Sequence, residues 1–252
     1  MNEIYTRNVQ IINYIKEKKQ VKTEEIAKEF FLSESSVRRI FDSLEKQGAI
    51  KRIHGGATIS ETNVESALNV RSLINYEAKR KLAKFALPYI PEFTSIFLDN
   101  SSTVLALAKA MDLTSKTVVT NGLSVALELT DEDTKELICL GGPIRKSSTG
   151  IYGSRACEAL NGFAFDVMIF SCASIDSTST YESTDDVASF KYVSKRYGKK
   201  KILIVDSSKF DKSNPCRSFF LNNFDLILTD ASHEIVDPIK EQGANIITSS
   251  EI

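Results

Sequence analysis

A pair of arginines, two short hydroxyl residues and a cationic stretch further on supply the chemistry of DNA recognition within residues 33–57. The guanidiniums of Arg38 and Arg39 can donate paired hydrogen bonds to a guanine edge or to phosphates. Serine hydroxyls can bond either to bases or to the DNA backbone. The residues that we expect to contact DNA are Ser35, Ser36, Arg38, Arg39, Lys51, Arg52, His54 and Gly55.

A helix that begins after Ser33 would position the first four of these residues. Ser33 is a good N-cap, Glu34 complements the positive helix end, and Gly48 is typical of a helix end. Apolar residues recur at i, i+3, i+4 and i+7 and predict one buried face, made of Val37, Ile40, Phe41 and Leu44. The opposite face would present the serines and arginines near the helix N-terminus, where a recognition helix meets DNA.

A β-hairpin would position the remaining four residues. Residues 49–54 alternate in the manner of a strand, Gly55-Gly56 can form a turn, and residues 57–59 can return as the partner strand. In such a wing the side chains of Lys51, Arg52 and His54 would reach phosphates. A hairpin that only covers the helical core is the alternative.

Two further helices are expected before the recognition helix. Ile11, Ile12 and Ile15 share one face of the first helix, which would end at Lys16–Lys19. Thr23 would cap the second helix, with Ile26 on its buried side. Together with the helix after Ser33 this is the order of a helix-turn-helix domain. A small helical domain without DNA-binding function is the alternative interpretation.

The rest of the chain alternates short β-rich segments with helix-length segments and therefore predicts an α/β domain with a mostly parallel sheet. A helix is expected over residues 78–89, and two more over residues 103–111 and 122–130. The expected strands are residues 95–99, 117–120, 137–141, 167–171, 202–206, 226–229 and 245–248. The predicted architecture is thus an α/β C-terminal domain preceded by a small winged helix-turn-helix domain, with bounds at 1–59, a linker at 60–75, and 76–252.

Small polar residues follow several of these strands, at the edge where ligands bind in parallel sheets. Backbone N–H groups and cationic side chains there could hold the phosphate of a sugar phosphate. Each loop taken alone is also compatible with an ordinary turn. The residues that we expect to bind this effector are Asp99, Asn100, Ser101, Ser102, Thr103, Asn121, Gly122, Gly141, Gly142, Arg145, Asp176 and Lys209.

Composition limits the other possibilities. The 252 residues are 42% apolar and 26% charged, as in globular proteins, and their formal net charge is −1. Residues 1–57 carry 11 Lys and Arg against 8 Asp and Glu, whereas residues 58–252 carry 21 against 25, so the basic charge lies with the predicted DNA-binding domain. We find no apolar run long enough for a membrane span and no signal pattern, and we expect a cytoplasmic protein.

Metal and disulfide chemistry is not expected. The four cysteines are widely spaced and lie mostly in apolar segments, which favours free thiols over a disulfide or metal framework. Two histidines leave few ligands for zinc. We expect neither a metal nor a cofactor.

The run Leu32–Arg39, followed by Leu44-Glu45, Gly48, Ile50, Arg52 and His54–Ala57, resembles the DeoR family of bacterial transcriptional regulators. Asp99–Thr103, Thr120-Asn121, Leu140–Gly142 and Asp206–Phe210 resemble the same family's effector domain. The resemblance implies a domain similar to ribose-5-phosphate isomerase and the CoA transferases, with phosphorylated sugars or sugar-pathway intermediates as ligands. Three segments depart from the family pattern: Ile40-Phe41 replaces Asp-Leu, serines replace the glycines of Gly-x-x-Gly-Ile-Asp at Ser171 and Ser174, and Thr184–Lys191 replaces Asn-x-x-Glu-Ala-x-Val-Lys.

The leading hypothesis is a repressor of a sugar-metabolism operon. A homo-oligomer, dimer or tetramer, would hold two winged helices on double-stranded operator DNA until a phosphorylated sugar binds. One alternative is a sugar-phosphate isomerase-like enzyme with Asp99 or Asp176 as base and Lys209 as the cation that stabilises an enediolate. Another is a DNA-binding regulator whose effector domain has lost its ligand.

Overall fold

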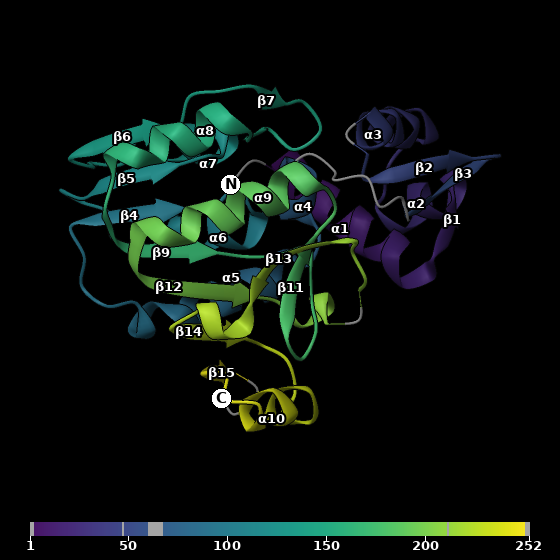
Figure 1. The fold of residues 1–252 in the computed structure, drawn as a ribbon. Helices are drawn as coiled ribbons and strands as arrows, with labels where there is room; N and C mark the ends of the chain where they lie inside the picture. Colours follow the sequence, from purple (N-terminus) through teal and green to yellow (C-terminus); the bar gives the residue numbers. More distant parts are fainter. Residues whose placement is uncertain (1–2, 47, 60–67, 211, 250–252) are drawn as a thin grey trace. The chain divides into compact units, whose positions relative to one another are not determined.

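The computed structural model describes residues 3–46, 48–59, 68–210 and 212–249 (Figure 1). Contacts between Cα atoms divide the chain into two units, Met1–Tyr76 and Glu77–Ile252. Residues 60–67, which begin the expected linker, lie outside the described residues.

Unit 1 contains the three predicted helices and the predicted wing, and a fourth helix, α4, follows the wing in the chain. Its strands pair antiparallel in the order β1-β3-β2, with β2 and β3 forming the wing. β1 was not predicted, because only Val21 of its three residues is buried and so short a segment has no readable period. The elements are α1 (Glu3–Lys18), β1 (Gln20–Lys22), α2 (Thr23–Glu29), α3 (Glu34–Lys46), β2 (Ile50–Ile53), β3 (Gly56–Ile59) and α4 (Leu68–Leu73).

The core of unit 1 follows the predicted apolar spacing. Ile11, Ile12 and Ile15 of α1 are fully buried, as is Ile26 of α2. Val37, Phe41 and Leu44 of α3 complete this core, while Ile40 is only partly buried. Helix α4 lies in the segment expected to be a linker, and Leu73 at its end belongs to the same core.

The structure corrects two details of unit 1, one in the wing and one at the start of α2. The turn is His54-Gly55, and Gly56 is the first residue of β3, paired with Lys22 of β1. A Cβ at Gly56 would lie 2.0 Å from the carbonyl oxygen of Val21, so the close approach of β1 requires a glycine there. Thr23 does not cap α2: it is the first helical residue, and its hydroxyl donates to the Gly55 carbonyl at 3.0 Å.

Unit 2 is built on a seven-stranded sheet in the order β15-β14-β12-β9-β4-β5-β6, and every neighbouring pair is parallel (Figure 1). All seven predicted strands are present. They are β4 (Ser95–Leu98), β5 (Thr117–Thr120), β6 (Glu136–Cys139), β9 (Phe165–Phe170), β12 (Gly198–Val205), β14 (Leu226–Thr229) and β15 (Ile246–Thr248).

The other elements of unit 2 are helices and short antiparallel strands. The helices are α5 (Tyr76–Ala86), α6 (Ser102–Ala108), α7 (Leu123–Glu128), α8 (Ser154–Ala159), α9 (Asp185–Ser194) and α10 (His233–Glu241). β7 (Ile144–Arg145) pairs with β8 (Gly150–Ile151), and β11 (Ser179–Glu182) lies between β10 (Ser174–Ile175) and β13 (Cys216–Phe220). These antiparallel pairs were not predicted. β7, β8 and β10 have only two residues each, and burial along β11 and β13 does not alternate from one residue to the next.

The order of the strands reverses between β4 and β9. From β4 the chain adds β5 and β6 on one side, and it then returns to β9 and continues through β12, β14 and β15 on the other. In open parallel sheets a crevice forms at the carboxyl ends of strands where the order reverses in this way. Asp99 and Ser171 directly follow β4 and β9, and they therefore mark the expected ligand position.

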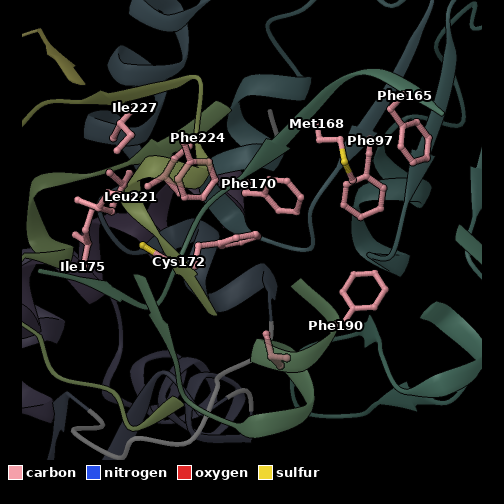
Figure 2. Close-up of a cluster of buried hydrophobic side chains, with 14 of the residues drawn as sticks. Phe97, Phe165, Met168, Phe170, Cys172, Ile175, Phe190, Leu221, Phe224 and Ile227 are labelled. Atoms are coloured by element: carbon pink, nitrogen blue, oxygen red, sulfur yellow. The ribbon is translucent and has the colours of Figure 1, made fainter. Parts of the chain in front are cut away.

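Aromatic side chains fix the elements around this point (Figure 2). The ring of Phe97 on β4 lies 5.8 Å from that of Phe170 on β9 and 6.3 Å from that of Phe190 on α9, between ring centroids. Phe170 also lies 5.1 Å from Phe219 on β13. The core thus holds helix α9 and the antiparallel strands against the carboxyl end of the parallel sheet.

Candidate functional site

The exposed face of α3 is the first part of the candidate site. Ser35, Arg38 and Arg39 are exposed and Ser36 is partly exposed, on the side opposite the buried Val37, Phe41 and Leu44. The predicted division of the helix into an apolar and a cationic face is therefore present.

Both ends of α3 are capped in the predicted way. The Ser33 hydroxyl accepts a hydrogen bond from the Ser36 backbone N–H at 3.2 Å. Gly48 has φ +77°, its N–H donates to the Glu45 carbonyl, and the Ala49 N–H donates to the Leu44 carbonyl. This pair of bonds is the Schellman arrangement, in which a glycine stops a helix without strain.

The two arginines of α3 differ in their surroundings. Arg38 Nη2 forms an ion pair with Glu34 Oε2 one turn earlier, at 2.7 Å. The Arg39 side chain is exposed. A phosphate or base would compete with Glu34 for Arg38, whereas Arg39 can approach DNA directly.

The wing presents two of its three cationic-capable side chains to solvent. Lys51 and His54 are exposed, and Gly55 in the turn has φ +75°. Arg52 instead forms an ion pair with Asp42 of α3, at 2.6 Å between Nη1 and Oδ1. Its side chain is 28% exposed.

The second part of the candidate site is a buried ionic cluster where the order of the parallel sheet reverses. Lys191 Nζ of α9 lies 2.9 Å from Asp99 Oδ2 and 2.8 Å from Glu182 Oε1. The same ammonium donates to the Ser171 carbonyl at 2.6 Å, and the Ser171 N–H donates to Asp99 Oδ2. The cluster therefore joins the ends of β4, β9 and β11 to α9.

Lys191 stays charged in this position. Burial alone would lower its pKa, but the carboxylates of Asp99 and Glu182 outweigh that effect and raise the pKa above its usual value. The described contacts of the cluster thus place two carboxylates around one ammonium.

Asn100 lies at the centre of a neighbouring hydrogen-bond network. Its backbone N–H donates to Asn121 Oδ1 at 3.0 Å, and its Nδ2 donates to the Ser148 carbonyl and the Tyr152 hydroxyl. Two glycines allow this packing, since a Cβ at Gly122 would lie 2.8 Å from Asn100 Oδ1 and one at Gly150 would lie 2.4 Å from Asn100 Nδ2.

Three buried oxygen atoms at this edge have no hydrogen-bond partner among the described residues: Asp99 Oδ1, Asn100 Oδ1 and Ser148 Oγ. Buried polar atoms are nearly always paired with protein, water or ligand. The carboxylate oxygen of Asp99 and the amide oxygen of Asn100 can only accept hydrogen bonds, so their partners would be hydroxyls, water or other donors.

The residues after Asn100 have structural partners. The Ser101 hydroxyl caps α6 by accepting from the Val104 N–H at 3.1 Å, and the Ser102 hydroxyl accepts from the buried Lys79 Nζ at 2.9 Å. Thr103 is buried within the first turn of α6. The structure thus brings Asp99–Thr103, Asn121 and Gly122 together, as the sequence predicts.

Other predicted effector residues lie apart from the cluster or are already engaged. Asp176 is exposed in the β10–β11 turn, where its carboxylate accepts from Thr178, Ser179 and the Tyr181 hydroxyl. Partial burial would raise its pKa, but these bonds lower it overall. Arg145 forms an ion pair with Asp186 at the start of α9.

The loops after β6 and β12 offer less to an anion than the sequence indicates. Gly142 has φ +142° and packs near Ile151, while a Cβ at Gly141 would meet no atom within 4 Å. The Ser207 N–H already donates to Asp230 Oδ1, and the Ser208 hydroxyl donates to Asp206. Lys209 is a cation of this region. Burial raises the pKa of the Cys172 thiol, and Lys191 and Lys209 oppose that rise.

Sequence reasoning missed Lys191, Glu182, Lys79, Ser148 and Tyr152. A signal for the two lysines exists: Lys191 shares a helical face with the buried Val187, Ala188 and Ser194, and Lys79 shares one with Leu82, Ala83 and Ala86. A lysine on an apolar stripe indicates a buried partner of opposite charge. Glu182 and Ser148 belong to short irregular segments that give no such signal.

Over the described ranges, no group of three or more His, Cys, Asp or Glu side chains could hold a metal ion. The four cysteines are free, and burial raises the pKa of Cys172 well above that of an ordinary thiol. None of the helices in the described part of the chain is both long and apolar enough to cross a membrane.

Comparison with known proteins gives two family matches. The DeoR-like helix-turn-helix domain matches residues 7–63, and the DeoR C-terminal sensor domain matches residues 74–231. The first match lies within unit 1, and the second lies almost wholly within unit 2.

Curated relatives are similar over most of their length. The chain is 29% identical to the glycerol-3-phosphate regulon repressor of Escherichia coli K12, over 88% of each chain. It is 27% identical to the transcriptional repressor GlcR of Bacillus subtilis, over 97% of this chain and 96% of that protein. It is 29% identical to the L-fucose operon activator of Haemophilus influenzae, over 90% and 92%.

Among solved structures, ribose-5-phosphate isomerase A from Neisseria gonorrhoeae matches 53% of each chain with a TM-score of 0.39 and 17% identity. This likeness is too distant to support a conclusion about function.

Proposed function

The chain belongs to the DeoR family of transcriptional regulators, and on that premise we propose that it represses a sugar-metabolism operon until a phosphorylated sugar binds its effector domain. The observation that carries the proposal is the cationic face of α3 beside an exposed wing, in a chain whose second unit has unpaired buried acceptors. Among the relatives, the glycerol-3-phosphate regulon repressor supports repression, and the L-fucose operon activator shows the opposite direction of regulation.

The DNA-binding part of the proposal assigns a role to each exposed residue. Arg38 and Arg39 would read base edges, Ser35 and Ser36 would bond bases or phosphates, and Lys51, His54 and the Gly55 backbone would contact phosphates. A homo-oligomer, either dimer or tetramer, would place two such surfaces one helical turn or a multiple apart on the operator. The cytoplasm, where the chromosome lies, is the compartment that this role requires.

In the effector part of the proposal, different residues bind the hydroxyls and the phosphate of a sugar phosphate. Asp99 Oδ1 and Asn100 Oδ1 would accept hydrogen bonds from sugar hydroxyls, with Ser148 Oγ beside them. Because the cluster holds two carboxylates, we place the phosphate elsewhere along this edge, with Lys209 as a cation that would receive it. In this proposal Asp176 and Arg145, which have protein partners, would have structural roles.

We also propose that the chain is a regulator and not an isomerase. Asp99 Oδ2 is engaged by Lys191 Nζ and by the Ser171 N–H, and the Asp176 carboxylate is held by the donors of its own turn, so both candidate bases already have protein partners. An NMR time course with ribose 5-phosphate tests this point. Turnover that disappears in Lys209→Ala would contradict it.

The proposal as a whole is tested by titrating sugar phosphates into a complex of the full chain with labelled operator DNA and following the anisotropy. We expect one class of sugar phosphate to release the DNA with a coupling of about 1–3 kcal/mol. Asn100→Asp should raise the ligand concentration needed by ~10-fold, equivalent to ~1.4 kcal/mol, because it adds a second unpaired negative charge. Asn222→Asp, a change at an exposed asparagine in the same unit, is the matched control.

If no sugar phosphate changes either the anisotropy or the melting temperature, the effector domain has lost its ligand and the effector part of the proposal fails. DNA binding would then persist unchanged, so the two parts can be judged separately. A bound ligand at saturation must raise the melting temperature by mass action.

A further inference from the structure

Arg52 lies on the wing, but its side chain turns back onto the recognition helix. Its Nη1 donates to Asp42 Oδ1 at 2.6 Å, and its guanidinium carbon lies 5.4 Å from the centroid of the Phe41 ring. The Arg52 backbone N–H donates to Glu45 Oε1 at 2.8 Å. These three contacts join β2 to three residues of α3.

The neighbouring side chains of the wing behave differently. Successive residues of a strand point to opposite faces, so Lys51 points away from the side on which Arg52 meets α3. Lys51 and His54 are exposed, whereas Arg52 is mostly covered. In the wing, Arg52 is thus engaged with protein, whereas Lys51 and His54 are exposed and available to DNA.

The other edge of the wing is fixed by backbone acceptors. The Thr23 N–H and hydroxyl both donate to the Gly55 carbonyl, at 2.8 and 3.0 Å. The Thr58 hydroxyl donates to the Lys19 carbonyl at 2.7 Å. These bonds hold the wing to the start of α2 and to Lys19 between α1 and β1, and Arg52 supplies the link to α3.

Asp42, the partner of Arg52, lies on the face of α3 that we expect to contact DNA. It lies three residues after Arg39 and four after Arg38, which places it one turn along the same face of α3. A bare carboxylate there would repel phosphates, and the guanidinium of Arg52 neutralises it.

We propose that Arg52 is a positioning residue of the DNA-binding surface, which holds the wing against α3 and neutralises Asp42 without contacting a phosphate itself. The inference rests on the proposed DNA-binding function. It replaces the expectation from sequence that Arg52 contacts DNA in the same way as Lys51 and His54.

The test is a double-mutant cycle in the full chain, with Arg52→Ala, Asp42→Ala and the double variant titrated against a selected operator at several salt concentrations. We expect Arg52→Ala to weaken binding ~10-fold in the wild-type background and less than ~3-fold in the Asp42→Ala background, since contacting pairs couple by this amount. Lys51→Ala is the control for a phosphate contact, and it should lower the salt slope by about 0.9.

A direct phosphate contact by Arg52 gives a different pattern. Removal of Arg52 would then cost the same affinity in both backgrounds and would lower the salt slope by about 0.9, as for Lys51→Ala. Either that pattern or an unchanged affinity in Arg52→Ala overturns the inference.

A second measurement does not need DNA. Hydrogen exchange of the β2 and β3 amides in the free protein should accelerate in Arg52→Ala and in Asp42→Ala, and no further in the double variant. Unchanged exchange would overturn the link between the wing and α3. Failure of the wild-type chain to bind any operator, with accelerated exchange in both variants, would instead count against the proposed function.

Discussion

Lys191 Nζ lies 2.9 Å from Asp99 Oδ2, and both side chains are buried where the order of the parallel sheet reverses. The bond joins helix α9 to the end of strand β4. Because Glu182 and the Ser171 carbonyl share the same ammonium, the lysine sets the geometry of the ends of three strands at once.

Replacing Lys191 with methionine should therefore be costly. The change leaves Asp99 and Glu182 buried without their cation, and breaking a buried ion pair in this way lowers the free energy of unfolding by about 3–5 kcal/mol. Urea denaturation measures the difference. Lys200→Met is the control, since Lys200 pairs with Asp225 but is 59% exposed, and its loss should cost less than ~1 kcal/mol.

The contrast between Arg38 and Arg39 predicts unequal effects on DNA binding. Arg39→Ala should lower affinity for the selected operator by about 1–3 kcal/mol. Arg38→Ala should cost less, because Arg38 must first leave Glu34. Anisotropy titrations measure both, and Glu34→Gln should tighten binding, since it removes an anion and frees Arg38. An unchanged affinity in Arg39→Ala would argue against α3 as the recognition helix.

The glycines of the wing provide a matched pair of stability variants. Gly56→Ala would place a Cβ 2.0 Å from the Val21 carbonyl oxygen and must push β1 away from β3, so we expect a loss of more than ~2 kcal/mol. A Cβ at Gly55 meets no atom within 4 Å, and Gly55→Ala should cost only the ~1–2 kcal/mol of a left-handed residue. Thermal melts compare the two, and equal losses would contradict the position of β1.

The hydrogen bonds of Asp166 predict that unit 2 loses stability in acid. Lys199 and the backbone and hydroxyl donors of Thr94 and Ser95 lower the pKa of its carboxyl group well below the usual value. Its stabilising contribution is thus fully present above the unfolded pKa of about 3.9 and is lost as the pH falls toward the lower folded value. Asp166→Asn should destabilise the protein at pH 7 and much less near pH 2, as followed by urea denaturation. A deficit of equal size at both pH values would contradict this account.

Much of the fold could be predicted from sequence, because long elements carry a period. The seven parallel strands, the apolar face of α3 and the wing follow from spacing and turn residues. The antiparallel strands β7, β8 and β10 could not be predicted in this way, because two residues cannot show an alternation. Their pairing depends on contacts that form only in the folded chain.

The site was less predictable than the fold for a related reason. Residue type indicates which groups can bind an anion, but it does not show which partners they already have. Arg52, Arg145 and Asp176 each have a protein partner that lies far away in sequence or within an unpredicted turn. Lys191, in contrast, was overlooked, although its place on the buried face of α9 could have indicated a buried ion pair.

The most direct test of the central claim is selection of genomic DNA fragments by the full chain, with the double variant Arg38→Ala and Arg39→Ala as control. A sequence-specific regulator should enrich a few pseudo-palindromic sites near genes of sugar uptake or sugar phosphorylation, and the control should enrich none of them. Because phosphate contacts are strongest at low salt, the selection should be run there first. Absence of enrichment at low salt, or equal enrichment by the control, would contradict the claim that α3 reads an operator.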